Sequence, residues 1–180
     1  MRCPRCRLPN CLCAEIPTIQ TRTRVVIVRH YTEADRSSNT GRLAHLALPN
    51  SEIVEHGGDA GVATLADRDG AWLVFPAGPV AQAPLVPPPR SVVVLDATWA
   101  QARKMYRKIP ALRGLRMLHL PAAPMPSARL RNSPAEGMVS TIEAIARALR
   151  LIEGEAAAAP LEQLFAVAVA RAAQLGRLMR

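Results

Sequence analysis

The sequence predicts an α/β fold in which a mainly parallel sheet carries helices on both faces. Short apolar runs with the length of buried strands alternate with longer segments that show helical periodicity. Because strands that alternate with helices are joined by crossover connections, a parallel arrangement follows. Hydrophobic residues make up 49% of the 180 residues, whereas aromatic residues make up only 3%. Ala, Val and Leu must therefore build most of the core.

Strands are expected where short apolar, β-branched runs lie between polar or turn-forming residues. They are 24–29, 52–56, 71–75, 92–95 and 115–120. Helices are expected after the first and fourth strands and twice near the carboxyl end of the chain. They are 37–48, 100–108, 140–152 and 160–179. Two of them carry start signals: Ser140 and Glu143 have the spacing of a capping box, and Pro160 suits a first helical turn.

All four cysteines lie within the first thirteen residues. Cys3, Cys6, Cys11 and Cys13 offer four thiolates, which zinc binds in a closed, structural site. A redox pair or a metal-free turn would use the same residues. We expect zinc, because cytosolic thiols stay reduced and a metal would tie down a segment too short for its own core. Residues 1–20 are then an N-terminal segment before a domain of residues 21–180.

The chain carries 23 Lys and Arg against 14 Asp and Glu, a net charge of +9 at pH 7. Arginine forms forked contacts with phosphate, so the excess favours a nucleic-acid partner, although a general bias toward Arg and Ala would also produce it. The positions expected to bind RNA are Arg103, Lys104, Arg107 and Lys108. No leader sequence and no apolar run of roughly 18 residues is visible, which predicts a cytoplasmic protein without a membrane partner.

Asp96, Thr98 and Trp99 stand at the join between the fourth strand and the helix after it. In open α/β sheets, ligands bind beyond the carboxyl ends of the strands, so chemistry is expected at this join. A carboxylate, a hydroxyl and a large aromatic ring would suit a reaction site. The simpler interpretation is that Asp96 or Thr98 caps the helix and that Trp99 fills the core.

Polar residues near other strand ends have similar alternatives. His30 and Glu33 follow the first strand. They are either catalytic or, as we favour, a hydrogen-bonded bracket that holds a loop. Capping alone would explain Ser140 and Glu143. Residues 122–137 form a long irregular loop, and its arginines indicate a functional role.

Together these motifs resemble those of the DTW-domain proteins, which are tRNA-uridine aminocarboxypropyltransferases related to the SPOUT class of S-adenosylmethionine (SAM) enzymes. The tetrapeptide 96–99 is similar to the family's D-x-T-W signature. Further similar landmarks occur in the family's order between residues 3 and 144. They are the cysteine set, His30-x-x-Glu33, Asn39-Thr40-Gly41-Arg42, Phe75-Pro76, Arg131 and Ser140-Thr141-x-Glu143-Ala144.

The resemblance implies transfer of the 3-amino-3-carboxypropyl group of SAM to N3 of a tRNA uridine, with release of methylthioadenosine. In bacterial relatives this uridine stands at position 47 of the variable loop. Asp96 would take the N3 proton or bind the α-ammonium of the migrating group. Thr98 would stand beside it at the reaction site, and Trp99 would line the pocket or stack on the uracil. The fold is expected to be SPOUT-like, with a trefoil knot toward the carboxyl end.

The SAM-binding residues are also inferred from the resemblance. Arg131 would hold the SAM carboxylate, with Ser140 and Thr141 helping at a helix N-terminus. The adenosine would lie among the ends of two strands and the loop that leads to Ser140. The full set of residues expected to contact SAM is Phe75, Pro76, Asp96, Leu118, Leu120, Arg131, Ser140, Thr141 and Glu143.

Two other functions fit the sequence. A SPOUT-like RNA methyltransferase would release S-adenosylhomocysteine instead of methylthioadenosine. A zinc-bearing RNA-binding module without catalysis would need no polar cluster at the strand ends, and this cluster argues for an enzyme. No obligate protein partner is implied, and either a monomer or a homodimer fits the sequence.

Overall fold

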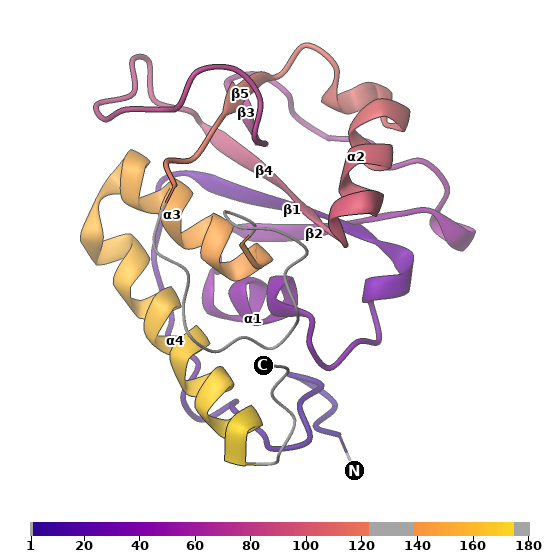
Figure 1. The fold of residues 1–180 in the computed structure, drawn as a ribbon, viewed down its shortest axis with the longest axis vertical. Helices are drawn as coiled ribbons and strands as arrows, with labels where there is room; N and C mark the ends of the chain where they lie inside the picture. The colour runs from indigo at the N-terminus through magenta and orange to yellow at the C-terminus, as the bar shows by residue number, and fades with distance from the viewer. Residues whose placement is uncertain (1, 123–138, 175–180) are drawn as a thin grey trace.

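The computed structural model describes residues 2–122 and 139–174, and five parallel strands form one sheet in the order β2-β1-β4-β3-β5. The strands are β1 (Arg24–His30), β2 (Ser51–His56), β3 (Ala71–Val74), β4 (Ser91–Asp96) and β5 (Arg116–Leu118). The predicted parallel sheet is confirmed (Figure 1). All five strands end at one edge, which we call the carboxyl edge.

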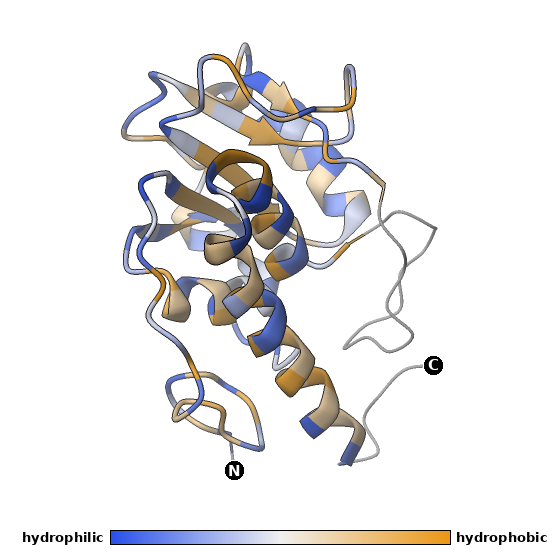
Figure 2. Cartoon of the chain, turned by 90° about the vertical axis from the view of Figure 1, so that its left-hand side faces the viewer, coloured by the Kyte–Doolittle hydropathy of each residue, from blue (hydrophilic) through white to orange (hydrophobic). Residues whose placement is uncertain are grey.

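Helices cover both faces of this sheet, as the sequence predicts (Figures 1 and 2). The helices are α1 (Thr40–Ala47), α2 (Trp99–Lys108), α3 (Thr141–Glu153) and α4 (Glu155–Gln174). Short 3-10 turns also occur: η1 (Tyr31–Glu33), η2 (Gly58–Ala60) and η3 (Pro110–Leu112). α1, α3 and α4 share one hydrophobic core with the sheet, whereas α2 packs on the opposite face.

Alternation along β1 explains how one strand serves both faces. Val25 and Ile27 belong to the core under α1 and α3, while Val26 and Val28 belong to the core under α2. Side chains in a strand point alternately to either face, so a strand covered on both sides must be apolar throughout. Ile27 is completely buried, and burial on this scale stabilises the fold by roughly 1.5–3 kcal/mol per large side chain.

The last helix begins earlier than the sequence predicts. α4 starts at Glu155, and Pro160 lies inside it instead of in its first turn. Gly154 ends α3 with a φ of +93°, and the next five residues are Glu and Ala, which form helices readily. Helix formation therefore begins at once, although Pro160 lacks the N–H that would donate to the carbonyl four residues earlier.

By length and composition alone, α4 could cross a membrane. A core helix passes the same test, and α4 buries Leu161, Leu164 and Phe165 against the rest of the protein. It packs against α3, and its carboxyl-terminal part extends past α3 toward the N-terminal segment (Figures 1 and 2). These contacts cover only part of its apolar surface, because 33% of its 18-residue apolar window is buried.

The connection from β5 to α3 runs through residues 123–138, which lie outside the described part of the chain. Arg129 and Arg131 belong to this stretch. The predicted trefoil knot also depends on its path and stays a prediction. After this connection, α3 lies beside α1 on the face opposite α2 (Figure 1).

Candidate functional site

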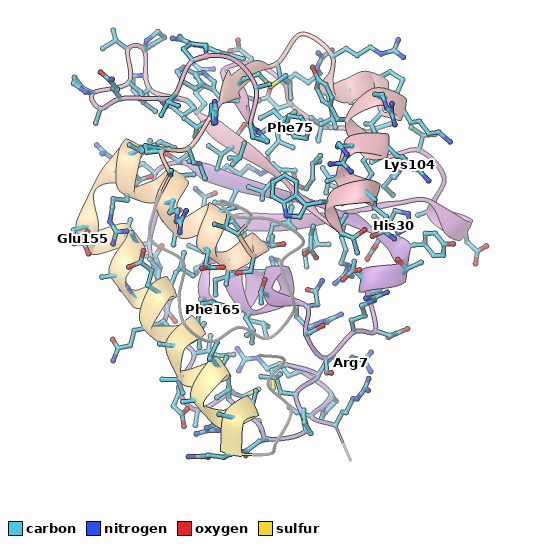
Figure 3. All side chains as sticks on the ribbon, in the orientation of Figure 1. Arg7, His30, Phe75, Lys104, Glu155 and Phe165 are labelled. Carbon is cyan, nitrogen blue, oxygen red and sulfur yellow. The ribbon has the colours of Figure 1, made fainter. Side chains whose placement is uncertain are left out.

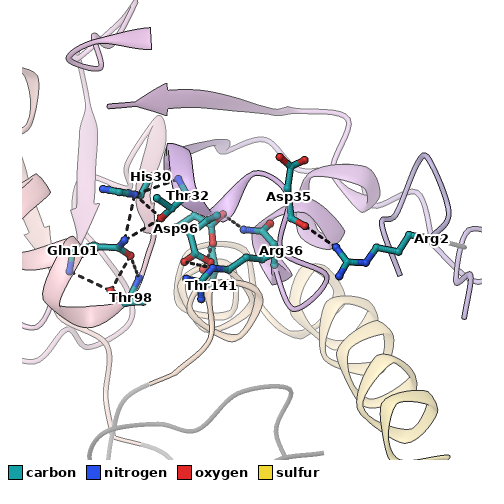
Figure 4. Close-up of polar contacts among 11 residues, drawn as sticks. Arg2, His30, Thr32, Asp35, Arg36, Asp96, Thr98, Gln101 and Thr141 are labelled. Atoms are coloured by element: carbon teal, nitrogen blue, oxygen red, sulfur yellow. Dashed lines mark hydrogen bonds and ion pairs between the residues drawn. The ribbon is translucent and has the colours of Figure 1, made fainter. Parts of the chain in front are cut away.

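Asp96 is the last residue of β4, and its carboxylate joins three elements at the carboxyl edge (Figure 4). Asn39 lies just before α1, and its Nδ2 donates to Asp96 Oδ2 at 2.5 Å. Thr141 is the first residue of α3, and its Oγ1 donates to Asp96 Oδ1 at 2.7 Å. Asp96 is only 4% exposed. A buried carboxylate with a donor on each oxygen is fixed in orientation.

The segment before and within α1 is shaped around this carboxylate. Asn39 also caps α1, because its Oδ1 accepts the Arg42 N–H at 2.7 Å. At Gly41, a Cβ atom would stand 2.7 Å from the Asp96 Cγ, which is closer than side chains approach. Thr40 Oγ1 accepts the Ile142 N–H at 3.3 Å and so links α1 to the start of α3. Glycine at position 41 therefore allows the helix to approach Asp96.

Asn39 and Gly41 are site residues that the sequence pattern alone does not single out. The signal that points to them is the Asn-Thr-Gly-Arg stretch within the family resemblance. Nothing in helix periodicity shows that a capping Asn would turn its amide toward a strand 57 residues away. Only the folded chain brings the two together.

Burial raises the pKa of Asp96, and the hydrogen bonds from Asn39 and Thr141 oppose part of this rise. Nearby Glu33 raises it further, whereas Arg29 lowers it. Arg29 pairs in register with Asp96 on one side and with Glu55 on the other, and its guanidinium donates to the Glu55 carboxylate at 3.0 Å. Glu55 on β2, Arg29 on β1 and Asp96 on β4 thus form a row of acidic, basic and acidic side chains across the sheet.

Thr98 caps α2, which confirms the simpler interpretation for this residue. Its hydroxyl accepts the Gln101 N–H at 3.3 Å and donates to Gln101 Oε1 at 2.8 Å. Trp99, the first residue of α2, is half-buried. The capping box commits the Thr98 hydroxyl to the helix start, while its place in the reaction stays a prediction.

Ser140 and Glu143 also form the predicted capping box. The Glu143 carboxylate accepts the Ser140 N–H at 2.8 Å and the Ser140 hydroxyl at 2.7 Å. Of the three polar residues that open α3, only Thr141 contacts Asp96. Any contact of Ser140 or Glu143 with SAM remains a prediction.

His30 has the bracket role that the sequence suggests. Its side chain accepts the Thr32 N–H at the start of η1. Glu33 is 1% exposed and pairs with Arg36 at 3.4 Å. These contacts hold the loop between β1 and α1, and that loop leads directly to Asn39.

The residues expected around the adenosine lie at the carboxyl ends of β3 and β5, but they do not share one face of the sheet. Phe75 stacks on Tyr106 of α2, with ring centroids 4.7 Å apart. Phe75 packs against the core under α2, the helix that carries Lys104 (Figure 3). Leu118 is fully buried in the core on the other face. Pro76 is exposed and Leu120 is half-buried.

The four cysteines come together as a candidate metal site. Their Sγ atoms all lie within 4.8 Å of one another, and a tetrahedral zinc site with Zn–S bonds of about 2.3 Å would place sulfurs about 3.8 Å apart. Hydrogen bonds from the backbone at Cys6 and Arg5 lower the pKa of Cys3 to about 6, and burial raises the pKa of Cys13 to about 12. The donor set and its spacing fit a structural zinc ion.

This cysteine segment is packed against the main core. Leu12 is completely buried and Cys6 is 2% exposed, within the core that α1, α3 and α4 share. Arg171 of α4 donates to the Cys11 carbonyl. Arg2 donates to the carbonyl of Asp35 at 3.1 Å, so the segment also contacts the loop between β1 and Asn39 (Figure 4).

The exposed side of α2 carries the basic residues predicted to bind RNA. They are Arg103, Lys104, Arg107 and Lys108. Among the described residues, no carboxylate forms an ion pair with any of them. α2 begins three residues after Asp96, so this basic face starts beside the carboxyl edge. Its position suits a polyanion, although contact with RNA stays a prediction.

Most of this chain is similar to proteins named tRNA-uridine aminocarboxypropyltransferase. A tRNA-uridine aminocarboxypropyltransferase 2 from Drosophila melanogaster is 28% identical over 84% of this chain and 66% of the relative. A protein of the same name from Mus musculus is 25% identical over 84% of this chain and 56% of its own length. The Arabidopsis thaliana tRNA-uridine aminocarboxypropyltransferase A is 29% identical over 84% of this chain and 72% of its own length.

The chain therefore spans about two thirds of the fly relative and just over half of the mouse relative. No solved structure matches it significantly. The DTW domain model matches residues 1–173, which include both the cysteine segment and the site around Asp96. The chain belongs to the DTW-domain family.

Proposed function

We propose that this protein is a SAM-dependent transferase that moves the 3-amino-3-carboxypropyl group to N3 of a uridine in tRNA. The observation that carries this proposal is the meeting of three family segments at one carboxylate. Asn39, Asp96 and Thr141 come from distant parts of the chain, and they converge at the carboxyl edge. Relatives over 84% of the chain are named as enzymes of this class.

The reaction needs a nucleophile and a base. N3 of the uridine attacks the methylene carbon next to the sulfonium, the C–S bond breaks, and its electron pair stays on the sulfur of methylthioadenosine. The N3 proton must leave as the N–C bond forms. A positioned base close to N3 would accelerate the step by about 10²–10⁴-fold.

Asp96 is the base in this proposal, and the Thr141 hydroxyl relays the N3 proton to it. The Asp96 carboxylate is buried, whereas Thr141 is half-buried and donates to Oδ1 at 2.7 Å. The Thr141 hydroxyl can take the N3 proton as it passes its own hydrogen to Asp96. The raised pKa of Asp96 favours this acceptance, because a base works best when its pKa approaches the working pH.

The remaining contacts follow from the family resemblance. Arg131 would hold the SAM carboxylate near the N-terminus of α3, and the adenosine would lie by the ends of β3 and β5. The tRNA would bind along α2, and we propose the variable loop at position 47 as the target. A zinc ion would bind the four cysteines and keep residues 3–13 against the core.

The test is incubation with SAM and unmodified tRNA, followed by identification of the small product. The proposal expects methylthioadenosine in amounts equal to modified uridine. S-adenosylhomocysteine alone would identify a methyltransferase instead. No turnover of SAM, together with tight tRNA binding, would identify an RNA-binding module. In either of these cases the proposed transfer is wrong.

A further inference from the structure

Two further ionisable residues lie in line with Asp96 across the sheet. Arg29 of β1 is the register partner of Asp96, and Glu55 of β2 is the register partner of Arg29. In each strand the residue two positions earlier belongs to the core under α1 and α3 or packs against it. Because side chains alternate along a strand, all three ionisable groups point to this one face. Arg29 therefore lies between the two carboxylates.

Glu55 holds the Arg29 guanidinium through a single oxygen. Arg29 Nε donates to Glu55 Oε1 at 3.0 Å, and Nη2 donates to the same oxygen. The third nitrogen, Nη1, is buried and has no hydrogen-bond partner in the part of the chain that the structure describes. Arg29 is 7% exposed, so water screens its charge poorly. Glu55 thus fixes the guanidinium without using all of its hydrogen-bonding capacity.

The charge of Arg29 acts on Asp96 against its other surroundings. Burial and the carboxylate of Glu33 both raise the pKa of Asp96, whereas Arg29 lowers it. A carboxylate can accept a proton only while it is ionised, so burial alone would disable this base over part of the pH range. The neighbouring positive charge favours the ionised form and keeps the base available.

The other ionisable residues on the surrounding elements have roles of their own. Glu33 of η1 pairs with Arg36, and Glu143 of α3 accepts hydrogen bonds at the start of its own helix. Arg42 of α1 donates to the carbonyl of Ala34 at 2.8 Å.

His45 of α1 also lies near Arg29. Burial, Arg29 and Arg42 lower the pKa of His45 below 6.5, which favours its neutral form. His45 titrates on the acid side of neutrality, so its own protonation needs a control.

We propose that Arg29, held by Glu55, is a positioning residue for the transfer, because its charge keeps Asp96 ionised and so sets the lowest pH at which the base works. This inference rests on the proposed function. Arg29 touches neither SAM nor uridine in this account and acts through Asp96. Glu55 has two effects, since it orients the guanidinium and offsets part of its charge. The two residues therefore adjust the base in opposite directions.

The pH profile of kcat tests this role. Arg29→Gln keeps an amide that can donate to Glu55 but removes the positive charge. The acid limb of its profile should move to higher pH by about one pH unit, which lowers kcat on that limb about tenfold. Glu55→Gln keeps an acceptor for Arg29 and removes the negative charge, so its acid limb should move to lower pH. A merely structural role would instead lower kcat equally at every pH.

Three further variants serve as controls. Arg29→Lys keeps the charge and should keep the wild-type limb, and His45→Gln should keep it as well. Arg29→Met combined with Glu55→Met replaces the ion pair by apolar side chains of similar length, a change that buried pairs often tolerate. This double variant should keep a cooperative thermal transition and still show the limb at higher pH, because it lacks the charge next to Asp96.

A second measurement follows Asp96 itself without substrate. NMR of the aspartate carboxyl carbons, with the Asp96 signal assigned from Asp96→Asn, should show this group titrating at higher pH in Arg29→Gln than in the wild type. Equal titration of Asp96 in the two proteins, or an acid limb that does not move, would overturn the inference. A wild type that forms no aminocarboxypropyluridine would overturn the proposed function, and the titration would still decide whether Arg29 controls Asp96.

Discussion

At the scale of single residues, the site is built around one carboxylate that the scaffold holds on both oxygens. Asn39 and Thr141 donate to Asp96, and Gly41 leaves room for it. A buried carboxylate without donors would be costly, so the hydrogen bonds from Asn39 and Thr141 offset part of its desolvation. Asn39 and Gly41 are buried, whereas Thr141 is half-buried.

The hydroxyl of Thr141 is therefore expected to be needed for turnover. Thr141→Val keeps the shape of the side chain and removes the route from the uridine to Asp96. Its kcat should fall by roughly 10²-fold or more, with little change in the KM for tRNA. Thr141→Ser restores a hydroxyl and is the matched control. If Thr141→Val retains full kcat, the proposed relay is wrong.

Burial of Asp96 also predicts how stability changes with pH. The pKa of Asp96 is raised above its ordinary value of 3.8. Between the ordinary pKa and the raised pKa of the folded protein, the native state holds a proton that the unfolded state does not. The free energy of unfolding therefore falls as pH rises through this range. Asp96→Asn removes this titration. Urea unfolding of both proteins across this range should show the difference moving in favour of the variant as pH rises and then levelling off.

Asp96→Asn also disturbs hydrogen bonds, which changes the free energy of unfolding by an amount that does not depend on pH. A constant difference between the two proteins is therefore expected. The change with pH is the informative part. A difference that is flat from pH 4 upward would contradict a raised pKa.

At the scale of elements, the sequence predicts most of the sheet, the capping box at Ser140 and a possible cap at Thr98, because those signals are local. It does not predict that Asn39 reaches Asp96, since that contact depends on how α1 crosses the sheet. The start of α4 is missed for a related reason. Pro160 is a typical first-turn residue, but helix formation in the Glu and Ala residues before it decides where the helix begins.

The exposed face of α2 yields a prediction about RNA binding. Changing Arg103 and Arg107 together to Ala should weaken tRNA binding at low salt. The slope of log Kd against log salt should become shallower by about 0.7–0.9 for each phosphate that the variant no longer neutralises. Fluorescence titration of labelled tRNA at several salt concentrations measures both effects.

The matched control removes two arginines from the opposite edge of the sheet. Arg22 and Arg90 precede β1 and β4, and their side chains are 87% and 75% exposed. Arg22→Ala with Arg90→Ala gives the same change in net charge. An equal weakening of tRNA binding in the two double variants would show that general charge, and not the α2 face, attracts the RNA.

At the scale of the whole molecule, the cysteine segment contacts both the last helix and the loop that follows β1. It contacts α4 through Arg171 and the loop before α1 through Asp35. Its Leu12 lies in the main core. Loss of order in this segment would therefore expose core residues and release the loop that leads to Asn39.

We expect the purified protein to hold one zinc ion per chain, measured by elemental mass spectrometry. Chelation should lower Tm by roughly 10 °C, because each kcal/mol shifts Tm by about 2–4 °C at this size and structural zinc contributes several kcal/mol. Re-addition of zinc should restore the original Tm. Metal-free protein with an unchanged Tm would rule out a structural metal at these cysteines.

The most direct test of the central claim is nucleoside mass spectrometry of tRNA from a strain that lacks this gene. The account predicts that aminocarboxypropyluridine disappears, that the wild-type gene restores it, and that a gene carrying Asp96→Asn does not. Unchanged aminocarboxypropyluridine in the deletion strain, or full restoration by Asp96→Asn, would contradict the account.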